Sequence, residues 1–242
     1  MTEFELQILG TGAGASQVYD GLPSSSFMLL QNETPVCLID LGLGVGHEVI
    51  KSFGGFPKDI IVTHNHSDHA GDLPVVLRVE QAKGRKCRVI CQQQIAERLQ
   101  QHRLAEHLER IAAKDLAEWL TPPQQVRTAL NEYFSIEFFQ GRHSELSFAF
   151  ILYYQERALL AYTGDSTLES ELYRTLSQAD TFIIDARPDS NTWHASFSEV
   201  GPWLKPGCYI IGHGLNNEQI EHYPHLPLLK QGQKLSLSLG QL

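Results

Sequence analysis

The residues best suited to chemistry lie in the run Thr63-His64-Asn65-His66-Ser67-Asp68-His69, which follows the apolar segment 59–62. Four of the last six side chains are imidazoles or a carboxylate, the groups that bind zinc and similar divalent metals. Residues two apart on an extended segment project to the same side, so His64 and His66 can bind one ion. Where the chain turns toward a helix, Asp68 and His69 can diverge toward a second ion.

A packing role for these four side chains is costly, because buried histidines and aspartates need separate hydrogen-bond partners or a metal. The pattern His64-x-His66-x-Asp68-His69 resembles the signature of the metallo-β-lactamase superfamily. The resemblance implies two divalent ions; this ligand chemistry suits zinc, with manganese or iron as alternatives. Iron-dependent electron-transfer relatives usually carry Glu at the position of His66, which favours hydrolysis. Iron-dependent sulfur dioxygenases share the His-x-His pattern and remain an alternative.

The superfamily pattern also implies three later ligands: a histidine after a strand, a bridging aspartate and a final histidine. Candidates stand in that order at His143, Asp165 and His213. Taken alone, His143 or His213 is more typical of a surface histidine, and the order of the three favours the ligand interpretation. The implied sets are His64, His66 and His143 for one metal, Asp68, His69 and His213 for the other, and Asp165 for both.

Other segments resemble the branch of the superfamily that holds ribonuclease Z and related phosphodiesterases. They include the glycine-rich opening 8–14, the serine run 23–26 and the segment 38–42. In that branch an acidic residue ends a strand and orients a histidine that faces the scissile phosphate. Asp185 and His194 match these positions, so the resemblance implies that Asp185 orients His194, which acts as general acid or contacts the phosphate. An incidental histidine in a helix-capping turn is the alternative.

Three features depart from ribonuclease Z. Asp185 is one methylene shorter than the glutamate usual there, and His213 is followed by Gly214 instead of an aromatic-Ser-x-Arg sequence. Only 22 positions (165 − 143) separate His143 from Asp165, and two strands with their turn fill that interval, where the nuclease carries its tRNA-binding arm. Processing of the tRNA 3′ end is therefore disfavoured.

The elements that would position these residues alternate along the chain. Apolar runs predict strands, and helical patterns follow several of them, which is typical of α/β layers. Polar side chains recur at the carboxyl ends of these runs, where α/β folds build their sites. We expect a single domain over 1–242, folded as a four-layer αβ/βα sandwich with two mixed sheets. A helical insert at about 92–119 is expected to pack on the body, with a lid or a dimer contact as alternatives.

Composition narrows the possible partners. The 242 residues include 28 acidic and 19 basic side chains, a formal charge of −9, whereas phosphate backbones are bound by clustered Lys and Arg. This disfavours a long nucleic acid and favours a small anionic substrate at a metal-bearing pocket. No apolar stretch reaches the roughly 18 residues of a membrane span, and no secretory signal opens the chain. We expect no membrane partner and a cytoplasmic protein, with a homodimer left open.

These observations together predict a metal-dependent hydrolase. The expected enzyme is a phosphodiesterase that attacks a small phosphodiester with a hydroxide activated between the two metals. Asp68, near that hydroxide, would orient it or take its proton. A carboxylic ester, lactone or thioester hydrolase could use the same ligands without His194. A metal-binding scaffold protein with little turnover is the alternative from a different class, and the complete ligand set argues against it.

Overall fold

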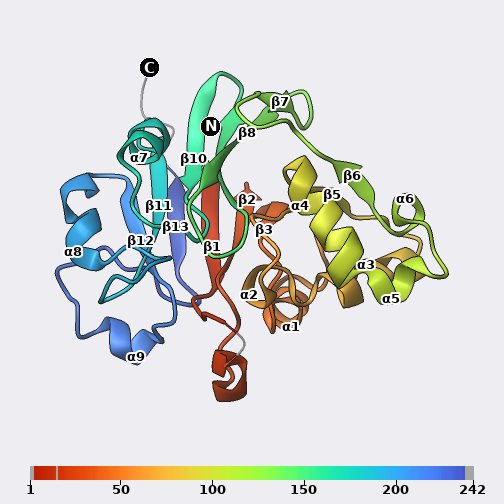
Figure 1. Ribbon diagram of the computed structural model, residues 1–242, viewed down its shortest axis with the longest axis horizontal. Helices are drawn as coiled ribbons and strands as arrows, with labels where there is room; N and C mark the ends of the chain where they lie inside the picture. Colours follow the sequence, from red (N-terminus) through yellow and green to blue (C-terminus); the bar gives the residue numbers. More distant parts are fainter. Residues whose placement is uncertain (1–2, 15, 238–242) are drawn as a thin grey trace.

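The computed structural model describes residues 3–14 and 16–237 of the chain. Within these ranges, the strands form two mixed sheets that face one another, with helices on both outer sides (Figure 1). This is the four-layer αβ/βα arrangement that the sequence predicts, and the predicted fold class is confirmed. Across the described part of the chain, no helix is both long enough and apolar enough to cross a membrane.

The two sheets are built from strands that are far apart in the sequence. One contains β1 (Phe4–Gly10), β2 (Ser26–Gln31), β3 (Thr34–Ile39), β4 (Asp59–Ile61), β5 (Arg88–Ile90), β6 (Glu118–Leu120) and β13 (Lys234–Leu237). The other contains β7 (Thr128–Ala129), β8 (Phe134–Gly141), β9 (Ser147–Tyr154), β10 (Arg157–Tyr162), β11 (Thr181–Ala186) and β12 (Cys208–Gly212). Their orders are β13-β1-β2-β3-β4-β5-β6 and β12-β11-β10-β9-β8-β7.

Parallel pairing sets where the site is built. Strands β3 to β6 pair in parallel in the first sheet, and β10 to β12 do so in the second. The carboxyl ends of parallel strands lie at one edge of a sheet, so the loops that follow them meet there. The functional residues named in the sequence analysis stand at the end of a strand or in the loop that follows one, except Asp68 and His69, which lie in the short helix α2 (Ser67–Ala70) after β4.

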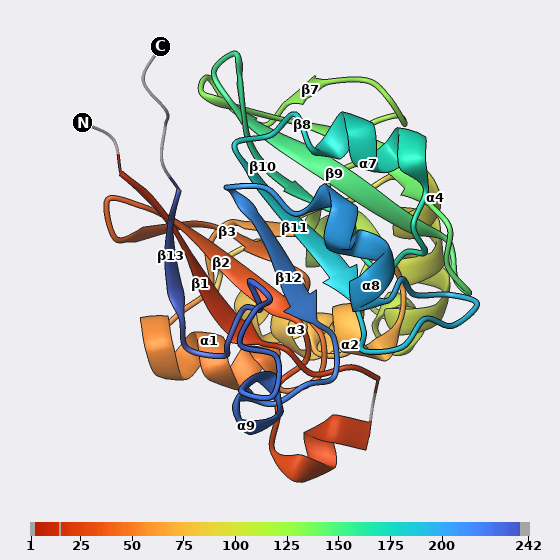
Figure 2. The same cartoon turned by 90° about the vertical axis from the view of Figure 1, so that its left-hand side faces the viewer.

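Helices cover the outer face of each sheet (Figures 1 and 2). Beside the first sheet lie α1 (Val45–Phe53), α2 (Ser67–Ala70), α3 (Leu73–Ala82), α4 (Gln93–Arg98), α5 (Ala105–Leu108) and α6 (Ala113–Leu116). Beside the second lie α7 (Ser170–Leu176) and α8 (Phe197–Val200), and α9 (Asn217–Ile220) follows β12. The helices bury apolar side chains such as Val49 and Leu77 on one side, and Leu176 and Val200 on the other.

Aromatic side chains fill the space between the sheets. Phe27 of β2 meets Tyr162 of β10 edge to face, with ring centroids 5.2 Å apart, and Phe150 of β9 contacts the same tyrosine. All three are fully buried. Such contacts add specific geometry to the burial of large apolar surfaces, so the sheets, and the loops at their edge, are held in one relative position.

The segment 92–119 differs from the single helical stretch that its spacing predicts. It contains α4, a π-helical turn (Leu99–Arg103), α5 and α6, and its last residues enter β6. The backbone of Ala112 is extended and separates α5 from α6. Leu99, Leu104 and Leu116 are all buried, so short helices that pack on one core satisfy the same apolar spacing as a long helix. The pattern could not show the breaks.

Candidate metal centre

The loop 64–69 runs from the end of β4 into α2 and lies against the segment that follows β3. Leu41 N donates a hydrogen bond to His69 O at 2.8 Å. A Cβ on Gly42 would lie 2.0 Å from Asp68 O, so only glycine allows the two segments to approach this closely. The backbone that carries four of the predicted ligands is therefore held in place before any metal binds.

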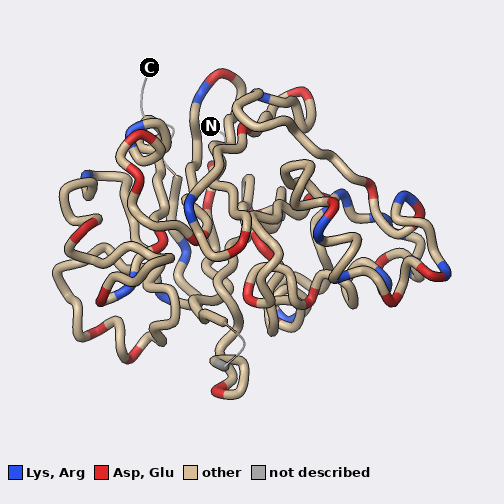
Figure 3. Tube along the Cα trace, viewed as in Figure 1, with Lys and Arg blue, Asp and Glu red and all other residues tan. Residues whose placement is uncertain are grey.

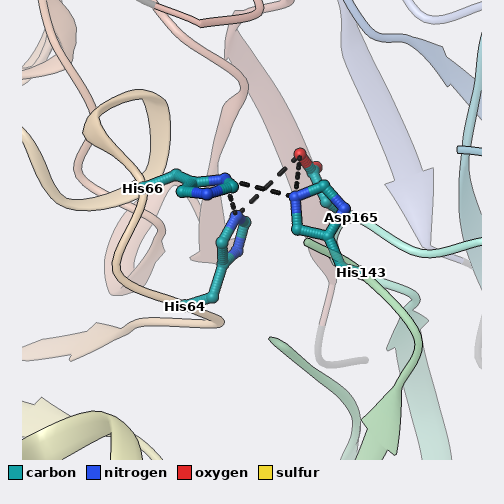
Figure 4. Close-up of side chains that lie close together, drawn as sticks. All are labelled: His64, His66, His143 and Asp165. Atoms are coloured by element: carbon teal, nitrogen blue, oxygen red, sulfur yellow. Dashed lines mark hydrogen bonds and ion pairs between the residues drawn. The ribbon is translucent and has the colours of Figure 1, made fainter. Parts of the chain in front are cut away.

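The first ligand group joins His64 and His66 of this loop with His143, which follows β8, and Asp165, which follows β10 (Figure 4). His66 Nδ1 lies 3.2 Å from both His64 Nε2 and His143 Nε2. Asp165 Oδ2 lies 3.9 Å from His64 Nε2 and 3.7 Å from His143 Nε2. The four ligand atoms surround one small volume, toward which the carboxylate points.

The second group consists of Asp68, His69, His213 and the same Asp165, all buried. His213 Nε2 lies 3.3 Å from both Asp68 Oδ2 and Asp165 Oδ2. His69 Nε2 lies 3.1 Å from Asp165 Oδ1. Asp165 therefore contacts members of both groups, the position required of a carboxylate shared by two ions.

Both groups fit a divalent metal ion. Ligand atoms about 2.0–2.2 Å from a tetrahedral ion lie about 3.3 Å from one another, and the shortest separations in the two groups are 3.1–3.3 Å. His69 Nε2, His213 Nε2 and Asp165 Oδ1 are buried without a hydrogen-bond partner. Buried polar atoms in that condition are costly, and an ion bound between them would satisfy all three.

Residues outside the ligand set hold the outer nitrogen of each buried ring. His69 Nδ1 lies 2.7 Å from Asp40 Oδ2, and His213 Nδ1 lies 2.9 Å from Ser25 Oγ. Thr63 Oγ1 lies 3.0 Å from His64 Nδ1. Contacts of this kind fix the orientation of a ring and leave its other nitrogen for the metal.

Asp40 and Ser25 were not among the predicted site residues. Asp40 follows β3 with a φ of 58°, a left-handed conformation that Asp tolerates better than most residues. Its carboxylate accepts hydrogen bonds from Thr63 N and Thr63 Oγ1. A polar residue at the carboxyl end of an apolar strand is the signal that could have identified Asp40. Ser25 has no comparable signal.

Burial and neighbouring carboxylates shift the imidazole pKa values in opposite directions in the two groups. Burial lowers the pKa of His69, but nearby carboxylates, Asp165 first, outweigh it and raise that pKa well above its ordinary value. The pKa of His213 is raised for the same reason, because nearby carboxylates, Asp165 first, outweigh the lowering effect of burial. In the first group burial prevails and lowers the pKa of all three imidazoles, most strongly that of fully buried His64. The rings of the first group therefore lose their protons more readily, whereas in the second group a metal must compete with more firmly held protons.

Asp185 and His194 form a third pair beside the ligand groups. His194 Nδ1 lies 2.7 Å from Asp185 Oδ2, so the shorter carboxylate reaches the ring. Arg187 Nη2 lies 3.0 Å from His194 Nε2. A guanidinium only donates hydrogen bonds, so Nε2 of His194 is the acceptor and Nδ1 carries the proton that it donates to Asp185.

A cavity of about 500 Å³ opens onto the site. Its wall includes His66 and His143 of the first group, Asp68 of the second, the shared Asp165 and the loop that follows β11. From that loop come Arg187, Asn191, Thr192, Trp193 and His194. Volumes of this size hold small ligands, and the substrate would meet the first ligand group and the His194 loop together.

Arg103 connects the helical segment to the metal loop. Its Nη2 donates hydrogen bonds to Asn65 O at 2.8 Å and to Ser67 Oγ at 3.1 Å, and its Nε donates to Asn65 Oδ1 at 3.1 Å. These residues flank His66. The sequence analysis did not identify this role, since a single arginine within an apolar pattern carries no distinctive signal.

The structure brings together all the residues that the sequence singled out. The predicted metal ligands fall into the two groups in the predicted division, and Asp165 stands between them. Asp185 and His194 lie beside Asp165. These residues are His64, His66, Asp68, His69, His143, Asp165, Asp185, His194 and His213.

Comparison with protein families gives one match over most of the chain. The family described as Anti-Pycsar protein Apyc1 matches residues 4–205. That range includes Asp185, His194 and every predicted ligand except His213.

Sequence relatives match a smaller part. Ribonuclease Z of Lactiplantibacillus plantarum is 33% identical over 82 residues, which are 33% of this chain and 26% of that protein. The chain thus matches about a quarter of the length of the curated relatives.

Solved structures are similar over nearly the whole chain. The metallo-β-lactamase fold protein YhfI from Bacillus subtilis has a TM-score of 0.76 at 16% identity, covering 97% of this chain and 99% of that one. The short form of human tRNase Z (ELAC1) has a TM-score of 0.71 at 17% identity, covering 97% and 100%. The metallo-β-lactamase fold that the sequence motifs predict is confirmed.

Proposed function

This chain belongs to the family of Anti-Pycsar protein Apyc1, and within that family we propose that it is a dinuclear metal-dependent hydrolase that cleaves small phosphodiesters. The observation that carries the proposal is the pair of ligand groups that share Asp165, in which the shortest separations between ligand atoms are 3.1–3.3 Å and the longer ones reach 3.9 Å. The nitrogen and oxygen donors suit two zinc ions, and manganese or iron would accept the same set. Bound there, two divalent ions supply Lewis-acid stabilisation of the attacking and leaving oxygens in an in-line displacement.

Asp68 is the residue placed to handle the attacking water. Its Oδ2 accepts a hydrogen bond from Gly14 N and lies 3.3 Å from His213 Nε2. Although burial raises the pKa of Asp68, the imidazoles of His69 and His213 outweigh it and hold that pKa below its ordinary value. Asp68 is therefore ionised, and it can orient a water or accept its proton.

His194 is the residue placed to act on the phosphate or the leaving group. Its ring lies against His143 and His213, with centroids 4.9 and 5.5 Å away, so it faces both ligand groups. Asp185 fixes the ring through Nδ1, which directs Nε2 toward the cavity. Once protonated at Nε2, His194 can donate a hydrogen bond to a phosphate oxygen or give that proton to the leaving alkoxide.

The distribution of charge on the surface favours a small substrate over a long polyanion. Basic and acidic positions are interleaved along the trace (Figure 3). Three members of the basic cluster Lys83, Arg85, Lys86 and Arg88 are matched by acids: Glu80 pairs with the first two and Asp59 with Arg88, while Lys86 donates to Lys114 O. These pairs leave little unmatched positive charge for a phosphate backbone. A cyclic or modified nucleotide is the kind of substrate that fits a cavity of this size.

The interval between His143 and Asp165 leaves no room for a tRNA-binding arm. Strands β9 and β10 occupy most of it, and only residues 155 and 156 join them. Both strands belong to the second sheet, with β9 paired to β8 and β10 to β11. This arrangement argues against processing of the tRNA 3′ end.

A side-by-side assay tests the proposed function. A sample of known metal content is given bis-p-nitrophenyl phosphate, a p-nitrophenyl carboxylic ester, a lactone and a thioester at matched concentrations. We expect turnover of the phosphodiester to exceed that of the other three, and to disappear after chelation and return with added metal. Preferential turnover of the ester, lactone or thioester would replace the proposal with that activity. No turnover of any of them by fully loaded protein would favour a binding role.

A further inference from the structure

Arg187 is held rigidly beside the metal centre. It directly follows β11, and its backbone is fixed on both sides of the strand end. Arg187 N donates a hydrogen bond to Ala195 O at 3.0 Å, and Arg187 O accepts one from Phe197 N at 2.8 Å. The same contacts hold the loop that carries His194. A side chain that starts from such a position is presented to the cavity with little freedom of its backbone.

The guanidinium of Arg187 is half-buried without a carboxylate partner. Within residues 3–14 and 16–237, Arg187 makes no ion pair. Its Nη2 donates to His194 Nε2, a neutral acceptor, and its Nε is buried with no hydrogen-bond partner. Burying a charge is costly unless the charge is paired and its donors are satisfied. None of the described residues neutralises this guanidinium, so its partner would be an anion from outside the protein.

Other arginines near the site do not share this condition. Arg103 is occupied by Asn65 and Ser67, Arg98 is paired with Glu145, and Arg142, directly before His143, is exposed to solvent. Among the described residues that line the cavity, Arg187 is the single Lys or Arg. The unmatched positive charge is thus located where the substrate enters, on the same wall as His194.

We propose that Arg187 is a substrate-binding residue that donates hydrogen bonds to a non-bridging oxygen of the substrate's phosphate. The planar fork of a guanidinium matches a phosphate with two parallel N–H donors, and charge-assisted bonds of this kind are among the strong ones. The inference rests on the proposed function, because it takes a phosphodiester as the anion. It assigns anion recognition to a side chain that belongs to neither ligand group nor to the Asp185–His194 pair.

Three variants test this role. R187Q removes the charge and keeps a polar side chain, and R187K keeps the charge but loses the planar fork. R110Q is the matched control, because Arg110 is exposed on the helical segment. Two quantities are measured on metal-loaded protein: the dissociation constant of inorganic phosphate by calorimetry, and kcat and KM for bis-p-nitrophenyl phosphate. Metal content is determined for each sample.

We expect R187Q to weaken phosphate binding and to raise the KM for the diester, each about 10- to 100-fold, the range for a hydrogen bond to a charged group. R187K should fall between the wild type and R187Q, and R110Q should match the wild type. If R187Q lowers kcat while phosphate affinity and KM stay unchanged, Arg187 only positions His194 and the proposal is wrong. If the wild type fails to hydrolyse the diester while phosphate affinity still falls in R187Q, the proposed function fails but anion binding by Arg187 stands.

Discussion

The two ligand groups share Asp165 but differ in how the protein surrounds them. The second group is buried, with Asp68 and the shared Asp165 reaching the cavity wall, and Asp40 and Ser25 hold the outer nitrogens of its rings. In the first group, His66 and His143 belong to the cavity wall, and the outer nitrogen of His143 contacts only the backbone oxygen of Trp193, at 3.1 Å. One position is built for retention of its ion and the other for access by a substrate.

This difference leads to an expectation about the metals. Residues that hold ligands from outside contribute 10- to 100-fold to affinity in order-of-magnitude terms, so the enclosed position should retain its ion more tightly than the open one. Variants that act on one group alone can test the division, and variants at the shared residue should affect both.

The largest effect is expected at Asp165. The protein as purified should hold close to two divalent ions per chain, and D165A should lose most of both, because each group loses the carboxylate that they share. Elemental analysis of the purified proteins measures this. D189A is the control, since Asp189 is exposed. A folded D165A protein with its full metal content would show that Asp165 does not bridge the groups.

A variant of His194 tests the side of the site where this ring faces both ligand groups. H194A should keep both metals, because His194 is in neither ligand group, yet lose about 10²–10⁴ in turnover of a phosphodiester. Steady-state kinetics and metal content on the same sample separate the two effects. An unchanged diesterase rate would remove His194 from the chemistry and favour ester or thioester hydrolysis.

Asp40 tests mainly the second group. D40N removes the carboxylate that holds His69 Nδ1 directly and should weaken the ion of that group about 10- to 100-fold. Asp40 reaches the first group only through Thr63, which contacts His64, so a titration with a competing chelator should show one strongly weakened ion and one less affected ion. S25A should give a smaller change in the same direction, since it removes a neutral contact to His213. Equal weakening of both ions would contradict the division into two groups.

Arg103 tests the first group through the loop beside His66. R103Q removes hydrogen bonds to Asn65 and Ser67, and we expect about tenfold weaker binding of the ion in the open position. The backbone of His69 is held separately by Leu41, so the enclosed ion should be less affected. The same chelator titration measures both ions, and loss of the enclosed ion first would contradict the expectation.

The smallest effect concerns protons. The pKa values of His69 and His213 are raised and those of the first group's histidines are lowered. The enclosed rings therefore hold their protons to a higher pH than the open rings do before metal binds. Loading the enclosed position should release more protons than loading the open one, and the release should shrink as the pH rises through the raised pKa values. Calorimetry in buffers of different ionisation enthalpy counts the protons, and release that accompanies the open position instead would reverse the assignment.

Most strands could be predicted from the sequence, but short strands at a sheet edge or within a helical pattern could not. The apolar runs that became β1, β8 to β12 and their neighbours were visible from composition and turns. Strand β13 has no such signal in the sequence, because its four residues form an edge strand that only pairing with β1 makes evident. Strand β6 was hidden in the apolar pattern of 92–119, because helical and strand spacings overlap over short runs.

The sequence by itself singled out the candidate metal ligands, because residue type and local spacing mark His64 to His69, and the superfamily pattern that this motif resembles implies His143, Asp165 and His213 in their order. The tertiary structure decided which residues support and complete the site. Asp40 lies 29 positions from His69, and Arg103 lies 38 positions from Asn65. Such contacts arise only where the loops of two facing sheets meet at one edge, so no local pattern encodes them.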